Sequence, residues 1–146
     1  MACRLQLMRR YFGFLLILEL LVIGIVTTIF KFIPDRMTAG AIAGTIFVLL
    51  GVYIVRGGWK EREKRTASYY AGCLHLFLSS LPLMITRLLN QSAGFEQVNV
   101  LGLPGPIFHR VSTTIYMILL IATIWDFVRA SKAQNLKDAT WPRDVG

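Results

Sequence analysis

Apolar residues are gathered into four long blocks, and the polar residues fall between them. The blocks cover about residues 11–33, 39–55, 67–89 and 111–128. A helix needs roughly 20 apolar residues to cross a hydrocarbon core about 30 Å thick. Each block is close to that length, so the pattern predicts four membrane-spanning helices in a single transmembrane domain covering 1–146.

Residues that stop or bend a helix punctuate the predicted spans. Pro34 follows the first block, and proline cannot continue a helix without strain because it lacks an amide proton. The pair Gly57-Gly58 follows the second block, where glycine commonly supplies the left-handed residue that closes a helix. Pro82 lies inside the third block and is expected to bend that helix.

Two longer segments lie outside the predicted spans. The outer loop, 90–110, leads through Pro104-Gly105-Pro106 into the fourth span, and the polar stretch 129–146 is expected to form a mobile cytoplasmic tail. We expect the outer loop to lie on the membrane surface or to dock a partner protein. This expectation rests on its apolar residues Phe95, Val98, Val100, Leu101 and Leu103.

Composition supports a membrane protein and argues against nucleic-acid binding. The chain is 55% hydrophobic and 16% charged, with a mean hydropathy of +0.57. Its net charge is +8, but the basic residues form short clusters between apolar blocks and not a face of a folded domain. Anionic lipid head groups at the cytoplasmic face are therefore the expected counter-charge, and no nucleic-acid partner is expected.

The positions of the basic residues predict the orientation of the spans, because Lys and Arg near short loops are retained in the cytoplasm. Twelve of the 16 basic residues fall in the first tail, the middle loop and the last tail, and four fall on the opposite side. The prediction is an all-α, up-down-up-down four-helix bundle with both termini cytoplasmic. The four opposite residues are Lys31, Arg36, Arg87 and Arg110, of which Lys31 and Arg87 are expected to be interfacial anchors.

Stripes of small and polar residues predict how the helices pack, because membrane helices associate through close contacts and interhelical hydrogen bonds. Matching depths from the cytoplasmic ends would place Gly72 beside Asp126, His75 beside Thr123 and Thr86 beside Ser112. The predicted packing residues are Gly40, Gly44, Gly51 and Gly58 in the second span, Ser68, Gly72, Ser79 and Thr86 in the third, and Ser112 and Thr123 in the fourth.

Glu19, His75 and Asp126 are ionisable residues inside predicted spans, where a charge is costly and often functional. One hypothesis is a proton relay or ligand site in the cytoplasmic half, because a carboxylate beside an imidazole titrates near neutral pH. The other hypothesis is purely structural, and we favour it. Glu19 lies off the Gly13 and Gly24 line of its own helix, which predicts that it faces a partner subunit.

No cofactor, metal site or catalytic constellation is predicted. His75 and His109 are the two histidines, and they are expected at different depths, which argues against a haem bound by both within one chain. The middle loop is a candidate surface for anionic lipid or a partner, although basic loops of this kind are more often topology signals. Its basic residues are Arg56, Lys60, Arg62, Lys64 and Arg65.

These features favour a non-enzymatic accessory or assembly subunit of a larger membrane complex, in a plasma membrane or bacterial inner membrane. The chain is small, and its polar stripes exceed what one chain is expected to need, so a membrane-protein partner or further copies of the chain are expected. The alternative is a small oligomeric transporter or channel with a proton or substrate path past Glu19, His75 and Asp126. Fold alone does not separate the two hypotheses.

Overall fold

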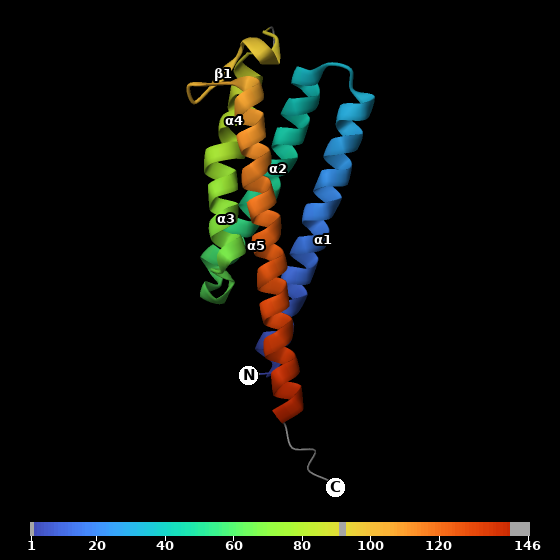
Figure 1. Ribbon diagram of the computed structural model, residues 1–146, viewed down its shortest axis with the longest axis vertical. Helices are drawn as coiled ribbons and strands as arrows, with labels where there is room; N and C mark the ends of the chain where they lie inside the picture. Colours follow the sequence, from blue (N-terminus) through green and yellow to red (C-terminus); the bar gives the residue numbers. More distant parts are fainter. Residues whose placement is uncertain (1, 91–92, 141–146) are drawn as a thin grey trace.

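Four helices long and apolar enough to cross a membrane make up almost all of the computed structural model, which describes residues 2–90 and 93–140 (Figure 1). By composition, the chain is therefore a multi-pass membrane protein. The helices are α1 (Ala2–Phe32), α2 (Arg36–Lys60), α3 (Ala67–His75) continuing through a π-helical turn, η2 (Leu76–Ser80), into α4 (Leu81–Leu89), and α5 (Gly105–Thr140).

Short elements join these helices at the two ends of the bundle. The 3₁₀ turn η1 (Arg62–Lys64) links α2 to α3, and we call its end of the molecule the basal end. Between α4 and α5 come the 3₁₀ turn η3 (Phe95–Gln97) and two short strands, β1 (Asn99–Val100) and β2 (Leu103–Pro104), which pair antiparallel. We call this the hairpin end (Figure 1).

Helices α1 and α5 run antiparallel, as their contacts show. Glu19 of α1 meets Thr123 of α5, while Gly13, nearer the start of α1, meets Phe127, farther along α5. A cluster of buried apolar side chains fills the centre of the bundle between α1, α2 and α5. Its buried members are Leu15, Val22, Leu50, Ile54, Tyr116 and Leu119.

The glycines of α2 lie against the α3–α4 helix. A methyl group added to Gly44 would touch Met84 at 3.2 Å, and one added to Gly51 would lie 2.9 Å from Leu76. Gly58 sits against the Tyr69 ring. This last contact explains why the prediction that Gly57-Gly58 closes the helix was wrong: α2 continues to Lys60, and Gly58 allows close packing inside it.

A π-helical turn precedes Pro82 in the third span. A proline in a helix removes an amide donor and crowds the preceding turn. In η2 the Leu81 amide reaches back five residues to the carbonyl of Leu76, so the extra residue makes room for the proline ring. The turn also directs the side chains of Ser79 and Ser80 into the bundle, where both are buried.

The predicted outer loop is largely ordered and folds back on the bundle. Val98 and Val100 are buried, and Val100 packs with Leu83 and Phe108, so the expectation that they lie on the membrane or bind a partner was wrong for these two residues. Leu101 and Leu103 are exposed. Helix α5 begins at Gly105 and not near residue 111, because Pro106 occupies the first helical turn, where a missing amide costs nothing.

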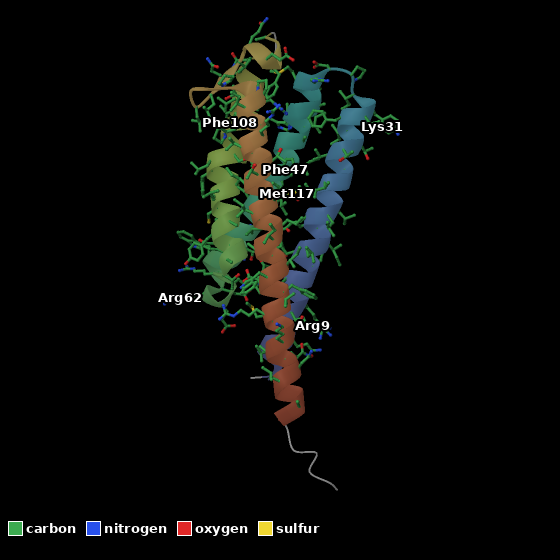
Figure 2. All side chains as sticks on the ribbon, in the orientation of Figure 1. Arg9, Lys31, Phe47, Arg62, Phe108 and Met117 are labelled. Carbon is green, nitrogen blue, oxygen red and sulfur yellow. The ribbon has the colours of Figure 1, made fainter. Side chains whose placement is uncertain are left out.

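The helices at the two chain ends are longer than the predicted spans. α1 begins at Ala2, and α5 continues through 129–140, so that part of the predicted mobile tail is helical. Residues 141–146, including Arg143, and residues 91–92 of the outer loop lie outside the described residues. The side chains of Arg9 and Arg62 lie toward the basal end, and Lys31 and Phe108 toward the hairpin end (Figure 2).

Candidate functional site

A cavity of about 290 Å³ lies between all the long helices in the hairpin half of the bundle. Figure 1 shows α1 and α5 separating toward the hairpin end. The walls of the cavity are mostly apolar, and its polar lining residues include Arg87, His75 and several hydroxyl residues. The lining includes Ile23, Val26 and Phe30 from α1, Ala43 and Phe47 from α2, Leu83 from α4 and Met117 from α5.

Arg87 of α4 closes the cavity at the hairpin end. Its side chain is 5% exposed, and its guanidinium lies 4.6 Å from the centre of the Phe95 ring. A desolvated cation over an aromatic ring gains about 2 kcal/mol, which offsets part of the cost of burial. Among the described residues, no hydrogen bond or ion pair reaches this guanidinium, and its Nε is buried without a partner.

This placement corrects the prediction that Arg87 is an interfacial anchor. The α2 helix leaves the space over Gly40 for the guanidinium, which occupies the position that a side chain there would take. η3 then brings Phe95 over the guanidinium, so only a small part of the side chain is exposed, toward the adjoining pocket. Lys31, the other predicted anchor, is exposed at the end of α1.

His75 borders the other end of the cavity. Its Nε2 lies 3.0 Å from the Ser80 hydroxyl, and its Nδ1 is buried without a partner. Phe47 and Tyr116 meet the imidazole edge to face, with ring centres 5.5 and 5.2 Å away. These aromatic rings hold the imidazole in place.

A more open pocket of about 500 Å³ adjoins the cavity at the hairpin end. It shares Phe30, Arg87 and His109 with the cavity and adds Arg36, so its charged lining residues are cationic. Asp35, the nearby carboxylate, serves as the N-cap of α2. Hydrogen bonds from the Thr38 hydroxyl and from backbone amides lower its pKa below the usual value of 3.8.

Glu19 is enclosed by α5, which overturns the prediction that it faces a partner subunit. It is 0% exposed, and its Oε1 accepts a hydrogen bond from the Thr123 hydroxyl at 2.7 Å. The line through Gly13 and Gly24 misled the prediction, because the buried stripe of α1 is formed by Phe12, Leu15, Glu19 and Val22. Gly24 has no neighbouring atom within 4 Å.

Asp126 caps a neighbouring helix. Its Oδ2 accepts a hydrogen bond from the Ser68 amide at 2.8 Å, and the Asp126 side chain is 4% exposed. The first amides of a helix have no partner within it and carry partial positive charge. A carboxylate from α5 therefore satisfies the start of α3, where Thr66 makes no side-chain cap.

The predicted register between the third and fourth spans was wrong by one to two helical turns. Asp126 bonds Ser68 and not Gly72, and Ser112 bonds the hydroxyl of Ser79 and not that of Thr86. Gly72 instead packs against Ile54 of α2. The assumption of equal depths failed because the two helices differ in length and the Ser68 to Asp126 bond sets their offset.

The polar residues of the predicted stripes are satisfied or buried within the chain's own bundle. The Thr86 carbonyl accepts hydrogen bonds from the Asn90 amide and side chain, at 3.1 and 2.9 Å. Ser68, Ser79 and Thr123 are all buried inside the chain's own bundle. Partner subunits are therefore not needed to satisfy these residues, which removes one motive for the subunit hypothesis.

Two of the five basic residues in the middle loop stabilise the loop itself. Lys64 pairs with Glu61 at 2.6 Å and lies over the Tyr11 ring, and the Arg65 Nε donates to the Gly58 carbonyl at 2.8 Å. The remaining three are exposed at the basal end and are free to meet lipid or a partner. They are Arg56, Lys60 and Arg62.

Glu19, His75 and Asp126 do not form one site. Each bonds a different residue, and of the three only His75 lines the cavity. His75 meets Tyr116, which lies seven residues from His109 on α5, so the two histidines are about 10 Å apart along the helix axis. The described residues hold no cluster of three or more His, Cys, Asp or Glu suited to a metal ion.

The sequence did not lead us to assign Arg87 or Ser80 to a cavity, although both line it. A signal was present, because positions seven apart share a helix face and Ser80 and Arg87 are seven apart. Comparison with protein-family models, curated proteins and solved structures found no match to this chain.

Proposed function

We propose that this protein is a non-enzymatic accessory or assembly subunit of a larger membrane complex. The observation that supports the proposal is a groove on the outer face of α1, with a volume of about 600 Å³. At its centre, Gly24 has no neighbouring atom within 4 Å, and Thr28 follows four residues later. The groove is lined by Ile17, Leu20, Leu21, Gly24, Ile25, Thr28 and Ile29.

The groove suits a second membrane helix. In lipid, helices gain little from burying apolar surface, and they associate where small residues four apart let backbones approach closely. Gly24 and Thr28 have this spacing, and Leu20 and Leu21, at the sides of the groove, are more than half exposed. A partner helix in the groove would contact the backbone of α1 directly.

The orientation belongs to the same proposal. We infer an up-down-up-down arrangement with both termini in the cytoplasm, because twelve of the 16 basic residues fall in the two terminal segments and the middle loop of the sequence. Arg56, Lys60 and Arg62 are exposed there and would meet anionic lipid head groups. A plasma membrane or bacterial inner membrane has such head groups at its cytoplasmic face.

The test is purification of the tagged chain from its native membrane in a mild detergent. We expect a stoichiometric second protein to co-migrate with the chain. Gly24→Leu fills the groove, and we expect it to lower the amount of co-migrating protein at least tenfold. The control is Thr114→Leu, which places the same leucine side chain at an exposed position on α5. A wild-type chain that migrates without a second protein, or equal retention by Gly24→Leu and wild type, would refute the proposal.

The competing hypothesis is a small oligomeric transporter or channel. Its predicted path past Glu19, His75 and Asp126 gains no support from the contacts, because no hydrogen bond joins these three described side chains and each bonds a different residue. A homo-oligomer that conducts ions in liposomes and loses the flux with Glu19→Gln would establish it instead. Glu19→Gln is suitable because the amide oxygen can still accept the Thr123 hydrogen bond.

A further inference from the structure

We propose that the cavity in the hairpin half binds a single-chain amphiphile whose anionic head group contacts Arg87 and whose apolar chain lies between α1, α2, α4 and α5. This binding site goes beyond the subunit proposal and does not depend on it. Three features support this binding site: the charge of Arg87, the shape of the cavity and its access from outside.

The charge of Arg87 lacks an anion. Its side chain is 95% buried, yet no described carboxylate lines the cavity or the adjoining pocket that it borders. Asp35 is bound to the start of α2, and Glu96 lines a different outer pocket. Buried guanidinium groups are normally paired with a carboxylate or phosphate, which they bind through parallel hydrogen bonds. An anionic ligand would supply the missing partner.

The cavity fits one apolar chain. Ligand pockets usually measure about 300–1,000 Å³, and this cavity of about 290 Å³ is at the small end of that range. Its walls between Arg87 and His75 are apolar, including Val26, Leu83 and Met117. From Gly40, beside Arg87, to Phe47, beside His75, α2 rises about 10 Å. A twelve-carbon chain is longer than this when extended and must bend to fit, and the volume leaves no room for the second chain of a phospholipid.

Access is from the hairpin end, where the adjoining pocket opens. Arg36 and Arg87 line that pocket, so an approaching head group meets two cationic side chains. The apolar chain then lies in the cavity between the helices. The positions of charge and apolar surface thus match the two ends of one amphiphile.

The first test uses wild-type protein in a neutral detergent, with matched probes at equal mole fraction. Dodecanoate, dodecyl phosphate, dodecan-1-ol and inorganic phosphate are titrated, with binding read by native mass spectrometry and by the shift in thermal unfolding. We expect at least one charged amphiphile to bind ten times more tightly than dodecan-1-ol, and inorganic phosphate not to bind. The stronger of the two identifies carboxylate or phosphate as the head group.

Two results would overturn the proposal. Equal binding of dodecan-1-ol and both charged amphiphiles would overturn the proposal, because the head group would then not be recognised. Binding of inorganic phosphate as tight as that of dodecyl phosphate would also overturn it, because the apolar chain would contribute nothing.

Variants locate the site. Arg87→Gln is expected to weaken binding of the charged amphiphile at least tenfold and leave dodecan-1-ol unchanged. Ala43→Leu adds bulk to the cavity wall and is expected to weaken binding of the charged amphiphile. This expectation holds whether or not Arg87→Gln folds. The matched control is Arg110→Gln, a cation at the same end that does not line the cavity. Equal losses for Arg87→Gln and Arg110→Gln would refute the site.

If Arg87→Gln does not fold, the wild-type comparison and Ala43→Leu still decide the matter. Undiminished affinity in a folded Ala43→Leu protein would place the amphiphile elsewhere. These measurements involve no partner protein, so their failure is distinguishable from failure of the subunit proposal.

Discussion

At the basal end, Asp126 and Glu19 each accept a hydrogen bond from a neighbouring helix, whereas at the hairpin end no described residue pairs with the buried guanidinium of Arg87. Asp126 accepts from the Ser68 amide, and Glu19 accepts from Thr123. Arg87 instead rests on the Phe95 ring beside a cavity. The difference indicates that basal polar groups hold the helices together, while the hairpin half keeps a charge and a space for a ligand.

The largest expected effect comes from removing a basal polar group. Asp126→Ala leaves the Ser68 amide buried without an acceptor, and a lost hydrogen bond to a charged group costs about 2–3 kcal/mol. We expect the free energy of unfolding in detergent to fall by that amount. Asp126→Asn keeps an acceptor oxygen and should fall by less. An unchanged stability for Asp126→Ala would mean that this carboxylate is not a structural cap.

Two glycine substitutions compare packing in the two halves. A methyl group on Gly72 would lie 2.6 Å from Ile54, which is 1% exposed and has nowhere to move, so Gly72→Ala should cost about 1–3 kcal/mol. Gly40→Ala meets the movable end of Arg87 beside the cavity and should cost less than about 1 kcal/mol. Thermal unfolding of both variants checks the difference. Equal losses would mean that both halves are packed equally tightly.

Replacing the unpaired charge should have the opposite sign to replacing Asp126. Arg87→Met exchanges a buried cation for an apolar side chain of similar length, and such exchanges are neutral or stabilising. Because the contact with Phe95 is lost, we expect ligand-free stability to stay unchanged or rise by about 1 kcal/mol. Unfolding measurements after exhaustive delipidation provide the readout. A loss of 2 kcal/mol or more, roughly the cost of breaking a satisfied buried contact, would contradict the absence of a partner for Arg87.

The smallest expected effect lies in the hairpin turn. Leu101 and Gly102 have φ values of 51° and 82°, which is the left-handed region that Asn-Gly turns prefer. Leucine is strained there, so Leu101→Asn should stabilise the protein by about 0.5–1 kcal/mol. Hydrogen exchange of the Gly105 amide, which bonds the Val98 carbonyl, should slow. Faster exchange would show that the turn depends on the leucine side chain.

Local patterns predicted the helices well because span length and helix stops depend on neighbouring residues. The third span was predicted as 67–89, and α3 through α4 cover the same residues. Predictions that needed the position of a second helix were less accurate. Glu19 was assigned to the wrong face, and the Asp126 contact was displaced by one turn, because a stripe shows which side packs and not the offset of its neighbour.

The sequence by itself determined four apolar helices and a line of glycines on α2, because periodicity and hydrophobic length are properties of each segment alone. Tertiary structure decided what became of the polar residues. It paired Asp126 with the start of α3 and buried Arg87 under Phe95, a residue eight positions away in the sequence. These environments depend on which side chains other segments bring near, and that depends on the π-helical turn before Pro82 and the returning hairpin.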